Sequence, residues 1–159
     1  MNLYRNAVIK IKRGQQKLSL ERVIFVDPKN DALYVYDMDN THQFPQKRVL
    51  SEYNDNLESG TEFELIDYMF IRSDLRTEEL TATEISHRDR SWDIIEPIVT
   101  NEPAVFDKKE RVRMIKEGAK KHGVCRNHVV RRMMLYWRYG MSINALAAAN
   151  LMKGGRGKP

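Results

Sequence analysis

The chain has 159 residues, of which 31% are charged and 42% hydrophobic, as in a soluble protein of one or two small domains. No apolar run approaches the ~20 residues that cross a bilayer, and the first residues lack the apolar core of a secretion signal. The single Cys125 excludes an internal disulfide, and no spacing of Cys and His residues suggests a zinc site. We therefore expect a cytoplasmic protein. Its net charge of +5 comes from residues 86–159, with 16 Lys and Arg against 7 Asp and Glu, whereas residues 1–85 hold 11 against 15, which indicates one region that meets a polyanion.

Residues 1–72 are predicted to form a β-rich domain. Ala7–Ile11 alternates apolar and basic side chains, and Val23–Val26 and Leu33–Tyr36 are short runs with β-branched and aromatic content. The stretch DPKND between those two runs and the stretch DMDN at 37–40 predict turns. We expect a small barrel or curled sheet.

One short helix interrupts these strands. Val49, Leu50, Tyr53 and Leu57 recur at helical spacing, and Gly60 stands where a helix would end. A last strand is predicted from Phe63 to about Ile71. Residues 73–90 are polar, without a strong apolar period, and are predicted to be a linker.

Residues 91–140 are predicted to form a three-helix domain. Trp92, Ile95, Ile98 and Val99 share one face of a first helix that Pro97 should kink. Residues 141–159 are predicted to form an extended basic exit linker.

The second helix is predicted to begin at a capping box, because Asp107 precedes Glu110 by three residues. Val112, Ile115 and Ala119 would face inward, and Gly123 would end the helix. The basic side chains expected to face outward are Lys108, Lys109, Arg113, Lys116 and Lys120.

The third helix runs from about Arg126 to Tyr139, and the turn before it matches a helix-turn-helix motif. Ala119 allows close packing, Gly123 supplies the backbone angle of the turn, and Cys125 stands where a serine or threonine N-cap is usual. The predicted inward stripe is Val129, Met133, Tyr136 and Trp137.

The opposite face of this helix would enter the major groove of DNA with its N-terminal end first. Arginine can bind guanine there with two hydrogen bonds, and asparagine can bind adenine. The predicted groove face is Arg126, Asn127, Val130, Arg131 and Met134. Arg132 stands where the motif usually has an apolar residue, so in a rotated helix Met133 would do that packing, and His128 and Arg132 would meet bases or phosphate.

The candidate DNA contacts are therefore Lys108, Lys109, Arg126, Asn127, His128, Arg131, Arg132 and Arg138. The alternative is a three-helix bundle whose arginines are only solvated. His42, His87 and His122 are isolated, and the acidic residues Asp27, Asp31, Asp37 and Asp39 stand in predicted turns. We therefore predict no catalytic and no metal-binding residue.

Four stretches resemble one known family: WDIIEPIV, RVRMIKEGAKKHGV, VVRRMMLYWRYG and NAL. In this order, and followed by a glycine-rich basic exit, they are similar to the N-terminal region of TnsB, the end-binding transposase subunit of Tn-seven-like transposons. That family belongs with the Mu-type transposases and the retroviral-like integrases. The resemblance is strong over residues 91–157. The β-rich leader is similar but less diagnostic, with a helix from about Gln46 that ends in LESG and a strand after it.

The resemblance implies sequence-specific binding of transposon-end repeats in double-stranded DNA for cut-and-paste transposition. It also implies other transposase subunits and an ATPase regulator as partners, and association with the nucleoid rather than a membrane. The family's RNase-H-type catalytic domain, with three carboxylates and two Mg²⁺ ions, is expected to be missing, so we expect a fragment with no cofactor that binds DNA without cutting it.

Two other functions remain open. A helix-turn-helix transcriptional regulator would bind a palindrome as a dimer, whereas the transposase interpretation predicts monomers on non-palindromic repeats. In a protein-interaction module, the β-rich domain would be the working part. Arg156 and Lys158, in the exit stretch GGRGKP, resemble short hooks that enter narrow A·T minor grooves, although a plain linker is the simpler interpretation.

Overall fold

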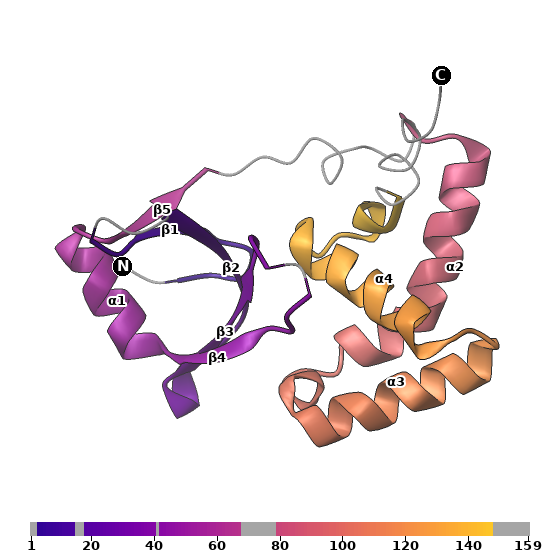
Figure 1. The fold of residues 1–159 in the computed structure, drawn as a ribbon. Helices are drawn as coiled ribbons and strands as arrows, with labels where there is room; N and C mark the ends of the chain where they lie inside the picture. The colour runs from indigo at the N-terminus through magenta and orange to yellow at the C-terminus, as the bar shows by residue number, and fades with distance from the viewer. Residues whose placement is uncertain (1–2, 15–17, 41, 68–78, 148–159) are drawn as a thin grey trace. The chain divides into compact units, whose positions relative to one another are not determined.

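The computed structural model describes residues 3–14, 18–40, 42–67 and 79–147. The chain separates into two compact units, residues 1–68 (unit 1) and residues 69–159 (unit 2). Strands lie in unit 1, and the helices α2, α3 and α4 lie in unit 2 (Figure 1). The predicted α+β fold, with a β-rich part before a helical part, is confirmed.

Unit 1 is built on a five-stranded antiparallel sheet with the order β4-β3-β2-β1-β5. The sheet is curled (Figure 1), which is one of the two arrangements predicted, a small barrel or a curled sheet. A register shift between Val23 and Phe25 interrupts the pairing of β2 with β3, and such irregularities increase strand bending. The strands are β1 (Val8–Lys12), β2 (Leu18–Asp27), β3 (Ala32–Asp37), β4 (Gln46–Val49) and β5 (Phe63–Ile66).

Helix α1 (Leu50–Ser59) closes the core of this unit. Tyr53 and Leu57 pack among the apolar side chains of the sheet, and the Tyr53 ring meets the Phe63 ring edge-on with centroids 5.1 Å apart. Gly60 ends the helix at φ 67°, as predicted. The helix begins at Leu50 rather than at about Gln46, because residues 46–49 pair with β3 as a strand that the sequence analysis missed.

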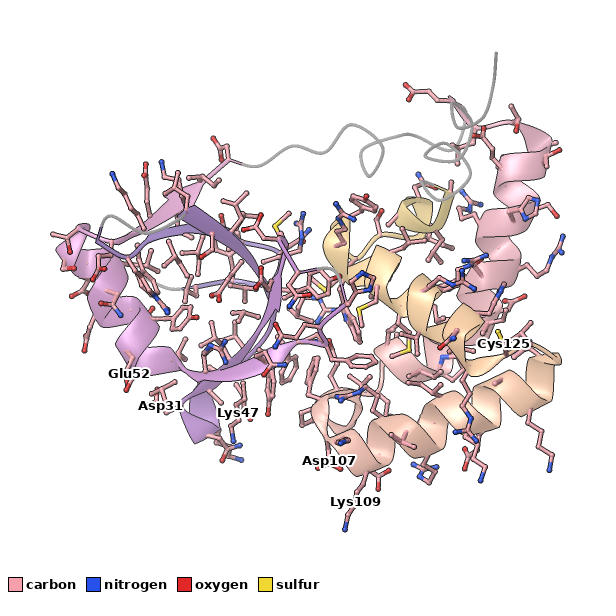
Figure 2. The ribbon with its side chains drawn as sticks, in the orientation of Figure 1. Asp31, Lys47, Glu52, Asp107, Lys109 and Cys125 are labelled. Carbon is pink, nitrogen blue, oxygen red and sulfur yellow. The ribbon has the colours of Figure 1, made fainter. Side chains whose placement is uncertain are left out.

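The start of α1 is held by a residue distant in sequence. Asp31 follows the short 3-10 helix η1 (Pro28–Asn30) and lies beside the first turn of α1 (Figure 2). Its carboxylate accepts hydrogen bonds from the backbone N–H and the hydroxyl of Ser51 at 2.8 and 2.7 Å. Asp31 therefore supplies the helix cap that Val49, at the N-cap position, cannot.

Unit 2 contains α2 (Ala82–Val99), α3 (Lys108–His122) and α4 (Arg126–Arg138), which contact one another pairwise. Two 3-10 helices, η3 (Ala104–Phe106) and η4 (Ile143–Ala147), complete the described part of the unit. The buried apolar residues of the three long helices are Ile94, Ile95, Ile98, Val99, Met114, Ile115, Ala119, Val129, Met133, Met134, Tyr136 and Trp137.

Two predicted linkers are wrong in part. Residues 82–90 belong to α2, which begins at a complete capping box in which Thr81 and Glu84 exchange side-chain-to-backbone hydrogen bonds of 3.1 and 2.9 Å. Residues 143–147 are not extended, because η4 packs against α2 and α4 and buries Ala145, Leu146 and Ala147. Residues 73–78 and 148–159 of the two predicted linkers lie outside the described residues. Pro97 lies in the last turn of α2.

Candidate nucleic-acid interface

Helix α3 carries two lysines in its first turn. The Asp107 carboxylate caps the helix by accepting a hydrogen bond of 3.1 Å from the Glu110 backbone N–H. Lys108 and Lys109 follow at once and are exposed. Figure 2 labels Lys109 beside Asp107 at the start of α3. Cations at a helix N-terminus oppose the helix dipole, so these lysines do not favour the helix itself. Their position suits an external anion.

The outer face of α3 is only partly available as a positive surface. Arg113 is paired with Glu110 at 2.6 Å and with Glu117 at 3.1 Å, so two carboxylates neutralise its charge. Lys116 and Lys120 are exposed, as predicted. Val112 was expected to face inward but is 49% exposed, and Met114 takes its place in the core.

The turn between α3 and α4 has the predicted chemistry. Gly123 adopts φ 66°, a left-handed angle that favours glycine, and Val124 N–H donates to the Ala119 carbonyl at 3.0 Å. Cys125 occupies the N-cap of α4 in an extended conformation and makes no side-chain capping bond (Figure 2). The first turn of α4 contains no acidic residue. The N-terminus of α4 is therefore electropositive and weakly capped.

Helix α4 divides into a buried and an exposed face. The predicted inward stripe of Val129, Met133, Tyr136 and Trp137 is confirmed, with Trp137 and Met133 wholly buried. The exposed side chains at its N-terminal end are Arg126, Asn127 and Arg131.

Asn127 and Arg131 lie one helical turn apart on this exposed face. Arg131 Nε donates to the Asn127 backbone carbonyl at 3.4 Å, which keeps the guanidinium on the same side as Asn127. Arg138 follows two turns later, half-buried, with its guanidinium carbon 5.1 Å from the centre of the Tyr139 ring. These three side chains form a polar stripe along α4.

Met134 was predicted on the groove face, but it is only 8% exposed and belongs to the core. Arg132 and His128 are half-buried rather than fully exposed. Arg132 Nε donates to the Ser91 hydroxyl of α2 at 3.2 Å. Burial, with the nearby charge of Arg131, lowers the pKa of Arg132 from its usual value.

His128 and Arg132 line a hollow of about 170 Å³ together with residues of α2. Arg90 and Ser91 were not predicted from the sequence to belong to a site, and His87 was predicted to be isolated, but all three line this hollow. The spacing of His87, Arg90, Ser91 and Ile94 on one helical face would have identified them, but only if residues 82–90 had been recognised as helix.

A second missed contact fixes the segment after α4. Arg88 is buried, donates from Nη1 to Asn144 Oδ1 at 2.9 Å, and forms an ion pair of 2.8 Å with Asp89. Asn144 opens the stretch NAL, so α2 holds η4 in place through this bond. Arg156 and Lys158 lie outside the described residues.

The turn acids do not gather into a metal site. Asp37 Oδ1 accepts from the backbone N–H groups of Asp39 and Asn40, Asp39 accepts from Leu20 N–H, and Asp27 accepts from the Asn30 side chain. Within the described ranges, no group of three or more His, Cys, Asp or Glu side chains could hold a metal ion. Among the same residues, no helix has the length and apolar character to span a membrane.

Comparison with known proteins adds one finding. No curated protein matches the chain. Residues 88–149 match the model of the family described as the TnsB second domain. The match runs from α2 through α3 and α4 to η4, and it therefore includes the turn at Gly123 and the polar stripe of α4. This part of the chain is similar to the second domain of TnsB-type transposases.

Proposed function

We propose that the chain binds transposon-end DNA as the N-terminal region of a DDE-type TnsB transposase, and that α3, the turn and α4 act as a helix-turn-helix. The observation that carries this proposal is the match of residues 88–149 to the TnsB second domain, which supports transposase-related DNA binding. The exposed arginines and asparagine of α4 supply the chemistry that such binding needs.

In this proposal α4 enters the major groove with its N-terminal end first. Asn127 binds the edge of an adenine, and Arg131 binds a guanine through two hydrogen bonds. Arg126, Lys108 and Lys109 contact backbone phosphates, which fix the position of the helix without reading sequence. Arg138 contacts the backbone further along the same stripe.

The wider setting is also part of the proposal. Other transposase subunits and an ATPase regulator are the partners that the TnsB resemblance implies, and the chain would act on nucleoid DNA in the cytoplasm. The positive balance of residues 86–159 supports the assignment of DNA binding to unit 2.

The test is a footprint of the full chain on the two ends of its parent element, together with binding measured at several salt concentrations. We expect protection of non-palindromic repeats by monomers, with affinity that falls steeply with salt. Protection of a palindrome by a dimer would instead identify a transcriptional regulator. Absence of salt-dependent DNA binding would overturn the proposal and favour a protein-interaction module.

A further inference from the structure

A second basic feature lies beside the polar stripe of α4. It is the hollow of about 170 Å³ between α2 and α4, here called the α2–α4 hollow. Its lining is His87, Arg90, Ser91 and Ile94 from α2 and His128 and Arg132 from α4. Both helices belong to unit 2 and contact each other.

The described lining of this hollow contains basic side chains but no acidic ones. Ile94 and Ser91 are buried, whereas Arg90 and His87 are exposed and Arg132 and His128 are half-buried. Two guanidinium and two imidazole groups therefore surround a small apolar and hydroxyl floor. None of the six described residues that line the hollow is acidic.

Arg132 is oriented toward this hollow by its own contact. The bond to Ser91 engages Nε, one of the five N–H donors of a guanidinium group. Two other arginines of unit 2 are paired with carboxylates, Arg113 with Glu110 and Glu117, and Arg88 with Asp89. In the α2–α4 hollow, two arginines converge without a carboxylate, an arrangement that an anion would stabilise.

The position of the hollow identifies the anion. His128 and Arg132 each follow a residue of the polar stripe, Asn127 and Arg131, by one position, which is about 100° around the helix. The hollow therefore flanks the face that we propose reads bases. A helix in the major groove has a sugar–phosphate backbone along each flank.

We infer that the α2–α4 hollow is a clasp for one phosphodiester group of the DNA backbone, with Arg90 and Arg132 binding the same phosphate. This inference rests on the proposed DNA-binding function and adds to it the contribution of α2. Because the two arginines share one phosphate, loss of either should remove the contact, and loss of both should remove nothing further.

The salt dependence of DNA binding tests whether Arg90 and Arg132 contact one phosphate or two. The full chain and the variants Arg90→Gln, Arg132→Gln and the double variant are titrated with one duplex at several salt concentrations. Each neutralised phosphate contributes about 0.9 to the slope of log affinity against log salt. We expect each single variant, and equally the double variant, to lose about one unit of slope.

Two controls keep the result interpretable. Lys29→Gln removes one exposed charge in unit 1 and should leave the slope unchanged. Arg90 is exposed, so Arg90→Gln should keep the fold even if Arg132→Gln, which loses the bond to Ser91, does not. If Arg90→Gln and the double variant keep the full slope of a chain that binds DNA, the clasp is wrong while the proposed function stands. If the unaltered chain binds no duplex, the proposed function itself fails.

The imidazole proton signals of the histidines distinguish DNA from free phosphate. The duplex should shift the signals of His87 and His128 but not that of His42 in unit 1, and Arg90→Gln should reduce the shift. Inorganic phosphate is added in a separate titration at matched pH and ionic strength. Shifts of His87 and His128 with inorganic phosphate, but none with duplex, would make the hollow a free-anion site and overturn the inference.

Discussion

Asn127 and Arg131 are the residues on which sequence-specific recognition should depend. Both are exposed, and neither supports the core, so alanine at either position should leave the fold intact. We expect Asn127→Ala and Arg131→Ala each to weaken binding to the end repeats by about 1–3 kcal/mol, because in the proposed binding mode each removes a paired contact with a base edge. Binding to random duplex should change much less. The measurement is a pair of titrations, one on each DNA. Equal losses on both would reassign the residues to phosphate.

A buried acid in unit 1 should make the stability of that unit depend on pH. Glu21 is 8% exposed, and its Oε1 accepts a hydrogen bond of 2.6 Å from the Tyr53 hydroxyl. Burial raises the pKa of Glu21 above its ordinary value of 4.5, although the Tyr53 bond and the charges of Arg48 and Arg13 lower it in part. The folded protein therefore holds this proton to higher pH than the unfolded chain does.

The stability of unit 1 should fall as the pH rises from about 4.5 through the raised pKa of Glu21, because the folded state binds more protons across that window. Glu21→Gln removes the charge and keeps an oxygen that can accept from Tyr53. Its stability relative to the unaltered chain should increase over the same window. Urea titrations followed by the amide signals of β2 and β3 measure the difference. A difference that is constant with pH would refute this prediction.

At the scale of elements, the weak start of α4 can be strengthened. The Cys125 side chain makes no capping bond although its backbone has the N-cap conformation. Cys125→Ser supplies an oxygen that can accept from the first-turn N–H groups, so it should stabilise unit 2 by about 0.5–2 kcal/mol. Both tryptophans of the chain, Trp92 and Trp137, lie in unit 2, so their fluorescence during urea unfolding reports on this unit. Cys125→Ala, which offers no acceptor, should show no such gain.

The elements with strong local signals could be predicted from the sequence. The sequence predicted the two ends of α3 from the caps at Asp107 and Gly123, and the structure has both. It also predicted the buried face of α4 from the apolar spacing of Val129 to Trp137. The first turns of α2 carry no such apolar stripe. Thr81 and Glu84 form a capping box at its start, but several of the following residues are polar because they line the hollow or make the Arg88 contact. Tertiary contacts stabilise a segment that periodicity assigned to a linker.

The candidate site was predictable only where local spacing, rather than tertiary contacts, decides which side chains are exposed. Spacing alone placed Asn127 and Arg131 on the exposed face of α4. Spacing could not decide which of Met134 and Arg132 is buried in the core, because this depends on how α4 is rotated against α2 and α3. The long side chain of Arg132 reaches Ser91 at the edge of the core, whereas Met134 is buried. The inward prediction for Val112 is wrong for a similar reason, because α3 is rotated so that Met114, two residues later, is buried instead.

At the scale of the whole molecule, the two units differ in charge. The excess of Lys and Arg lies in residues 86–159, and unit 1 contains more acidic than basic residues in its sequence. DNA affinity should therefore depend on the charges of unit 2 and be insensitive to single lysines of unit 1.

A matched pair of double variants tests this division. Lys108→Gln with Lys109→Gln removes two exposed charges at the start of α3, and Lys29→Gln with Lys47→Gln removes two exposed charges from unit 1. The α3 pair should lower the salt slope by about two units and weaken specific and random DNA alike, because phosphate contacts carry no sequence information. The unit 1 pair should change neither quantity. Equal effects of the two pairs would show that DNA binding belongs to the chain's overall charge rather than to unit 2.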